Sequence, residues 1–114
     1  METEIRDIIA EGTRVSGTIE GKEPLLVEGR VDGKIILENL LVVGKTATVE
    51  AEIFAQAVTV EGVVSGRIVA GDLVAIRAGA RVTGEVTTPR LIVEDDAVFD
   101  GTIRMESEEG QADG

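Results

Sequence analysis

The sequence predicts an all-β, single-domain fold: a right-handed parallel β-helix, or triangular β-solenoid, of about six rungs. Two observations lead to this prediction. A strand-like motif recurs along the chain, and the apolar residues are almost all small or β-branched. The chain has 114 residues and 43% hydrophobic residues, but only two Phe and no Trp or Tyr. A core without large rings suits thin layers that are stacked repeatedly.

The recurring motif is apolar-x-(Gly or Ala)-x-apolar. Its first positions are Val15, Val31, Val49, Val64, Val82 and Phe99. Its last positions are Ile19, Ile35, Ile53, Ile68, Val86 and Ile103. A third apolar column precedes the copies, at Ile9, Val27, Val43, Val60, Ile76 and Val93. Successive copies lie 15 to 18 residues apart, which is one turn of a β-coil rather than a strand and a helix.

Alternation with a period of two is typical of a strand, so the middle residue of each motif is expected to point inward with its apolar neighbours. These middle residues are always small: Gly17, Gly33, Ala51, Gly66, Gly84 and Gly101. We expect a narrow cross-section, in which a larger side chain at this position would collide with the opposite walls.

The spacing between copies varies at the corner that follows the third column. Three residues, as in 77–79, fill this corner in four rungs, whereas one residue, Glu28 or Glu61, fills it in two. Corners tolerate such length changes and strands do not. Irregular rungs favour the right-handed form, because the left-handed hexapeptide β-helix keeps a stricter spacing.

Outward positions on successive rungs carry charges of alternating sign. One such column is Lys34, Glu52, Arg67 and Glu85, and a second is Glu61, Arg77 and Glu94. Neighbours of opposite charge contribute roughly 0.2–1 kcal/mol per pair. The alternation therefore either controls the register of the rungs or is a solvated face with chance alternation.

The composition disfavours catalysis. With no His, Cys or Tyr, the chain lacks the usual bases, metal ligands and activated nucleophiles. The acidic run at 94–96 lacks the spacing of a calcium loop, so a solvated corner is favoured over an ion site. We predict a protein that is not an enzyme and that uses no cofactor or metal.

Charge and hydropathy also bear on partners and location. A net charge of −11 disfavours direct binding to nucleic acid and docking on an anionic bilayer. No apolar run approaches the roughly 20 residues of a membrane span, and the first residues lack the layout of a signal peptide. The default location is the cytoplasm.

The two ends of the solenoid are the expected working surface. We assign residues 9–104 to the solenoid, 1–8 to a short N-terminal tail and 105–114 to an acidic, flexible C-terminal tail. Ile5, Ile8 and Ile9 have helix-like spacing, which leaves open a small amphipathic cap instead of a tail. Terminal rungs without a cap leave backbone groups unpaired, and such ends can stack on another copy.

We therefore predict end-to-end polymerisation. The predicted interface consists of Ile9, Val15, Val98, Phe99 and Ile103. Phe99 stands where the other rungs have Val, so it either contacts the next subunit or fills a wider end rung.

A candidate lateral or partner surface follows the inner Ile on three rungs. Ile36, Phe54 and Val69 form either an outward apolar stripe or a corner where the side chains turn inward. The leading prediction is a filament-forming scaffold. The alternative is a discrete solenoid adaptor that presents this stripe to a protein partner.

The motifs VDGKI and VSGRI and the closing segment TPRLIVEDDAVFDGTI (88–103) resemble the bactofilins, over roughly residues 9–104. The resemblance implies a right-handed triangular β-helix that polymerises into cytoskeletal filaments without nucleotide. It also implies roles in cell shape and in positioning recruited proteins, and a part for Phe99 in assembly.

The resemblance implies a cytoplasmic, cytoskeletal location, in some members at the inner face of the cell membrane. The acidic start METEIRDI departs from the basic or hydrophobic membrane-targeting peptide of many bactofilins, which puts membrane association in doubt. The strong acidity, and eight Arg against three Lys, would also fit an archaeal relative, the halofilins.

Overall fold

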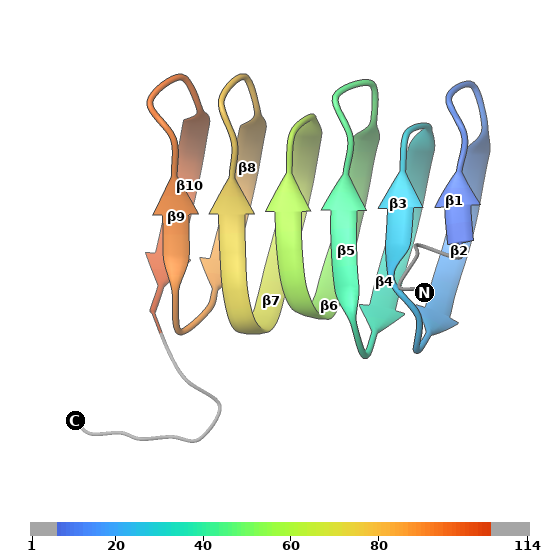
Figure 1. The fold of residues 1–114 in the computed structure, drawn as a ribbon, viewed down its shortest axis with the longest axis horizontal. Helices are drawn as coiled ribbons and strands as arrows, with labels where there is room; N and C mark the ends of the chain where they lie inside the picture. The colour runs from blue at the N-terminus through green and yellow to red at the C-terminus, as the bar shows by residue number, and fades with distance from the viewer. Residues whose placement is uncertain (1–6, 106–114) are drawn as a thin grey trace, which may run out of the picture.

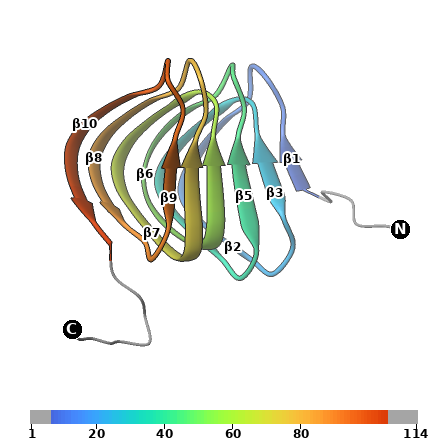
Figure 2. The same cartoon turned by 60° about the vertical axis from the view of Figure 1, so that its left-hand side comes forward.

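In the computed structural model, which describes residues 7–105, the chain winds into a parallel β-solenoid of six turns (Figures 1 and 2). Each turn contains a short strand and a longer, bent strand. The short strands are β1 (Asp7–Ile9), β3 (Leu25–Val27), β5 (Leu40–Val43), the second parts of β6 (Thr48–Val60) and β7 (Val63–Ile76), and β9 (Leu91–Val93). The longer strands are β2 (Arg14–Gly21), β4 (Arg30–Leu37), the first parts of β6 and β7, β8 (Arg81–Thr87) and β10 (Val98–Arg104).

Every strand pairs in parallel with its copy one turn away, and the pairing follows the columns of the sequence. Val31 pairs with Val49, Val49 pairs with Val64, and Val82 pairs with Phe99. The prediction of an all-β solenoid built from six stacked repeats is confirmed. Among residues 7–105 we find no helix with the length and apolarity needed to cross a membrane.

The core consists of the inward Val, Ile, Leu and Ala residues of the middle turns. Ile35, Ile53 and Ile68 are fully buried, one above another. Phe54 is only partly buried, and Phe99 packs against the edge of the core. Small side chains therefore suffice to fill the interior, as the composition predicts.

The prediction that the middle glycines point inward is wrong. Gly33 and Gly66 are exposed, and φ is +127° at both residues. The strand bends at the glycine. The apolar residues two positions before and two positions after it are therefore both buried, while the glycine itself lies on the outside. A Cβ on Gly66 would lie 2.4 Å from the carbonyl oxygen of Ala51. The collision is thus with the backbone of the preceding turn and not with an opposite wall.

Ala51 is the exception in this column, because it has no positive φ and its side chain is buried. Its methyl group adds to the core at a position where the glycines of the other turns have no side chain.

The two corner lengths are confirmed, and each has its own structural basis. The four long corners are closed by a backbone hydrogen bond of 3.0 Å, between Thr13 N and Ala10 O, Ala47 N and Gly44 O, Ala80 N and Arg77 O, and Ala97 N and Glu94 O. The two short corners contain Gly29 and Gly62. A Cβ on either glycine would lie 2.3 Å from a carbonyl oxygen of the long corner beneath it.

Residues 7 and 8, predicted to belong to the N-terminal tail, lie in a strand of the solenoid. Asp7, Ile8 and Ile9 form β1, which pairs with β3. Two of the three residues with helix-like spacing, Ile8 and Ile9, therefore lie in a strand. Ile5, and residues 106–114 of the predicted C-terminal tail, lie outside the described residues.

Candidate functional site

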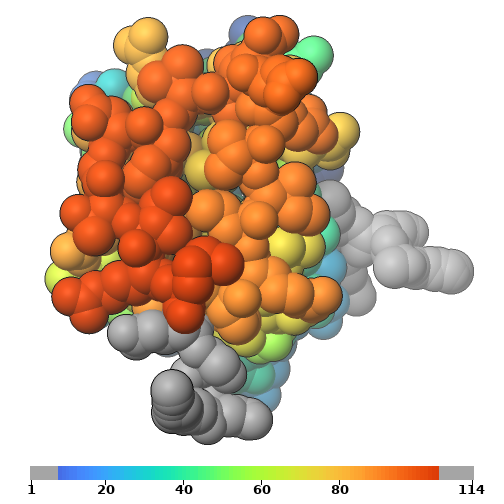
Figure 3. Space-filling view, turned by 90° about the vertical axis from the view of Figure 1, so that its left-hand side faces the viewer, coloured from blue at the N-terminus to red at the C-terminus, as the bar shows by residue number. Residues whose placement is uncertain are grey.

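The last turn of the solenoid, formed by β9 and β10, leaves residues of the core columns open to solvent. Val93 is 46% exposed, although Ile76 of the same column is fully buried. Ile103 is 38% exposed, although Val86 beside it is fully buried. Figure 3 turns this end toward the viewer, with β9 and β10 in orange and red. The C-terminal end is therefore apolar in the places where the interior turns have their core.

Phe99 lies in this terminal turn, level with Val82 of β8, and packs partly against the core. Val98 is 47% exposed, but it belongs to the outward column of Val63 and Arg81, so it lies at the rim of the end surface. The exposure of Val93 was not anticipated, although its place in a core column of the last rung could have indicated it.

The first turn shows the same feature at the other end. Ile9, Val15 and Ile19 are only partly buried. Their column neighbours one turn later, Val27, Val31 and Ile35, are fully buried. Within residues 7–105, β1 and β2 pair on one side only, with β3 and β4, so the outer edge of each strand has no partner.

Ile36, Phe54 and Val69 lie side by side on successive turns and are partly buried. They line a surface groove of about 540 Å³ just before the corners that lead into the short strands. The Lys34 ammonium lies 5.6 Å from the centre of the Phe54 ring, within reach of a cation–π contact. The structure thus places the three residues in one open stripe.

The charge ladder lies in register across four turns, from Lys34 through Glu52 and Arg67 to Glu85. Lys34 Nζ is 4.0 Å from Glu52 Oε1, and Arg67 Nε is 3.2 Å from Glu85 Oε1. These side chains are about half exposed, so each pair contributes at most about 1 kcal/mol. The column therefore consists of two ion pairs, Lys34–Glu52 on one pair of turns and Arg67–Glu85 on the next.

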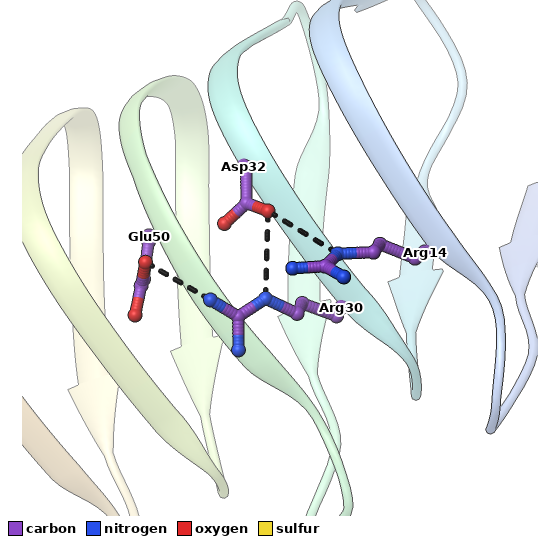
Figure 4. Close-up of polar contacts among 4 residues, drawn as sticks. All are labelled: Arg14, Arg30, Asp32 and Glu50. Atoms are coloured by element: carbon purple, nitrogen blue, oxygen red, sulfur yellow. Dashed lines mark hydrogen bonds and ion pairs between the residues drawn. The ribbon is translucent and has the colours of Figure 1, made fainter.

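A second set of charges crosses the first three turns on the other half of the long strands (Figure 4). Asp32 Oδ2 lies 3.7 Å from Arg14 Nε and 3.4 Å from Arg30 Nε, and Arg30 Nη2 lies 3.1 Å from Glu50 Oε1. Asp32 Oδ1 is buried and has no hydrogen-bond partner in the described part of the chain. The carboxylate of Asp32 lies between two arginines that share one column, which offsets their mutual repulsion.

Glu94 connects two successive long corners. Arg77 Nε donates to Glu94 Oε2 at 2.8 Å, and the Ala78 N–H donates to Oε1 at 2.9 Å. The Ala78 N–H is the main cause that lowers the pKa of Glu94; Arg77 lowers it further, and desolvation partly opposes them. Within residues 7–105, no three Asp, Glu, His or Cys side chains gather as they would around a metal ion.

Fold and surface together define a class: a β-solenoid whose terminal strands each pair with one other strand among residues 7–105, and whose apolar columns are open at both ends. The chain belongs to the bactofilin family, because the family model described as "Bactofilin: Polymer-forming cytoskeletal" matches residues 7–104.

Two curated relatives from Myxococcus xanthus (strain DK1622) are similar over most of their length. The chain is 53% identical to bactofilin BacN over 106 residues, covering 93% of this chain and 94% of BacN. It is 38% identical to bactofilin BacO over 102 residues, covering 90% of this chain and 81% of BacO. The comparison with solved structures gave no match.

Proposed function

We propose that this protein is a structural scaffold that assembles end to end, without nucleotide, into filaments that shape the cell or position partner proteins. The observation that carries the proposal is the exposure of core columns at the ends. Val93 and Ile103 are 46% and 38% exposed where interior residues of the same columns are fully buried. Membership in a polymer-forming family supports the same conclusion.

Stacking a second copy on the last turn would continue both the backbone ladder and the apolar columns. Among residues 7–105, β9 and β10 pair only with β7 and β8, so a second copy would add a neighbouring strand to each of them. The apolar area removed from water would contribute about 25 cal/mol per Å². Assembly of this kind needs no cofactor and no catalytic step, so we propose that the protein is not an enzyme.

The proposed interface keeps Ile9 and Val15 at one end and Phe99 and Ile103 at the other, with Val98 at the rim. The chain interacts with itself, and recruited proteins would bind along the filament. The proposal places the filaments in the cytoplasm.

The test is sedimentation and negative-stain microscopy of the purified chain without nucleotide. Wild-type protein is expected to pellet as filaments, whereas Phe99→Arg and Val93→Arg stay in the supernatant. Val63→Arg is the matched control, because Val63 is 38% exposed but lies in mid-solenoid. Circular dichroism establishes that each variant is folded. Wild-type protein that sediments as a sharp monomer at micromolar concentration would overturn the proposal.

The second candidate is a discrete adaptor that presents Ile36, Phe54 and Val69 to one protein partner. The groove of about 540 Å³ along this stripe favours it. A monomeric wild-type protein in the same sedimentation experiment is the result expected for the adaptor.

A further inference from the structure

The short strands of the six turns lie side by side and form one flat side of the solenoid (Figures 1 and 2). One outward column crosses this side from end to end. It consists of Ile8, Leu26, Val42, Thr59, Ala75 and Ile92. Ile8 and Ile92 are 58% and 51% exposed at the two ends, and the four residues between them are partly buried.

A second outward column runs beside the first. It consists of Pro24, Leu40, Ala57 and Leu73, all partly buried. The column ends before the last turn, where the exposed, charged Arg90 lies level with Leu73. We call the two columns together the short-strand face. These ten positions contain no charged residue, in a chain of which 29% of residues are charged. A contiguous uncharged, largely apolar face of this kind marks an interaction surface.

Charged residues border the short-strand face on both edges, and their signs are opposite on three turns. Glu38 precedes β5 and Lys45 follows it. Asp72 precedes the second part of β7 and Arg77 follows it. On the last turn, Arg90 precedes β9 and Glu94 follows it. Each of these turns therefore has one acidic and one basic edge.

This arrangement is complementary to itself. If a second copy is rotated by 180° about an axis parallel to the stack, its preceding edge meets the following edge of the first copy, turn by turn. Glu38 then meets Lys45. The ion pair of Asp72 with Arg90 meets the ion pair of Arg77 with Glu94, with opposite charges facing one another. On two other turns, Lys22 and Glu23 meet Glu28, and the neutral Gln56 meets Glu61. Electrostatic complementarity of this kind fixes register and orientation.

The area of the face decides the size of the assembly that it can hold together. Four residues along a strand at about 3.3 Å each, and six turns about 4.8 Å apart, give roughly 350 Å² per copy. Two such faces bury roughly 700 Å², below the roughly 1,200 Å² of a stable interface. Single subunits would pair only weakly, whereas subunits joined in a row add their faces together.

We propose that the short-strand face is a lateral interface, on which a second copy of this chain in a neighbouring filament packs face to face. The inference rests on the proposed function, because it requires subunits that are already joined end to end. Two chains of net charge −11 repel one another, so an uncharged face with complementary edges is where they can approach. The same net charge opposes an anionic lipid surface as the occupant.

The test is the width of filaments in negative-stain microscopy. Wild-type filaments are expected to be paired. The double variant Val42→Glu, Ala75→Glu is expected to give single filaments of half that width, with the same pelleted fraction. Val63→Glu is the matched control, because it places the same charge on an exposed valine of a long strand; its filaments should stay paired. If circular dichroism shows the double variant to be unfolded, Ala75→Glu alone is used.

A rescue experiment separates pairing from any general effect of added charge. Filaments of Val42→Glu and filaments of Val42→Lys should each stay single, and a mixture of the two should pair again. Wild-type filaments that are single, or paired filaments of the double variant, would overturn the inference while leaving end-to-end assembly intact.

Two further outcomes also contradict it. Wild-type protein that forms no filaments overturns the proposed function, and the lateral interface with it. Flotation with phosphatidylcholine or phosphatidylglycerol vesicles, lost in the double variant while filaments stay single, would assign the face to lipid instead.

Discussion

The carbonyl oxygen of Gly66 occupies the space in which a Cβ of Gly84 would lie, because the two positions would be only 1.9 Å apart. Gly84 has a φ of +127°, as Gly33 and Gly66 do. The bend of the long strand therefore depends on glycine twice: for its backbone conformation, and for the close approach of the turn beneath it.

Replacement of Gly84 by alanine is expected to lower the free energy of unfolding by about 3 kcal/mol or more. The backbone conformation alone costs on the order of 1–3 kcal/mol, and the turn must also move away from Gly66. Chemical denaturation measures the loss. The Val93→Arg background, in which end-to-end assembly is expected to fail, is used so that assembly does not add to the measured stability.

Gly79→Ala is the matched control for this prediction. Gly79 has a φ of +87°, but nothing lies within 4 Å of its Cβ position. Its substitution should cost about 1 kcal/mol, from backbone strain alone. Equal losses at the two sites would show that the close contact between turns carries no free energy.

The repeat could be read from the sequence because each core column holds one kind of residue. Val31, Val49 and Val64 recur 18 and 15 residues apart and lie level in the structure. The corner lengths could be read for the same reason. The outward position of Gly33 could not, because strict alternation assigns it to the interior, and a positive φ leaves no trace in a pattern of apolar residues.

Reversal of one charge in the ladder tests whether it controls register, which stays a prediction. Arg67→Glu places a third acidic residue between Glu52 and Glu85, which pair with position 67 from the two neighbouring turns. We expect a loss of about 1 kcal/mol, measured by thermal unfolding, that shrinks as salt screens the repulsion.

Arg81→Glu is the control for the ladder, because the neighbours of Arg81 in its column are Val63 and Val98. It changes the net charge by the same amount without placing acids side by side. A similar loss of stability in both variants would assign the effect to net charge rather than to the ladder.

Glu94 is expected to make part of the stability depend on pH. Its pKa lies below its ordinary value of 4.5, chiefly because the Ala78 N–H binds the ionised form. The folded state thus favours the charged carboxylate. The resulting stability is fully present above pH 4.5 and is lost as the pH falls through the lowered pKa.

Glu94→Gln should therefore lower the Tm at pH 7, and the difference from the parent protein should shrink below pH 4.5. Asp95→Asn is the control, since Asp95 is an exposed neighbour in the same corner. A difference in Tm that stays constant from pH 7 to pH 3 would contradict the assignment.

The sequence did not reveal the short-strand face, and the reason lies in the composition of the strands. In β5 the residues read Leu-Leu-Val-Val, and both the inward and the outward positions are apolar. Leu41 and Val43 are fully buried, whereas Leu40 and Val42 are only partly buried. A continuous apolar run does not show which residues face the core. Only the pairing of β5 with its neighbours separates the two sets.

The apolar stripe offers a comparison between two adjacent residues of β6. Ile53 is fully buried, whereas Phe54 is partly buried and lines the groove. Ile53→Ala should cost about 2–5 kcal/mol, because it leaves a cavity in the core. Phe54→Ala should cost less, about 1–2 kcal/mol, because its ring is partly exposed in the groove and loses less buried area, together with the contact with Lys34. Denaturant unfolding of both variants in the Val93→Arg background measures the difference. Nearly equal losses would mean that Phe54 serves the core, and the stripe would then be no partner surface.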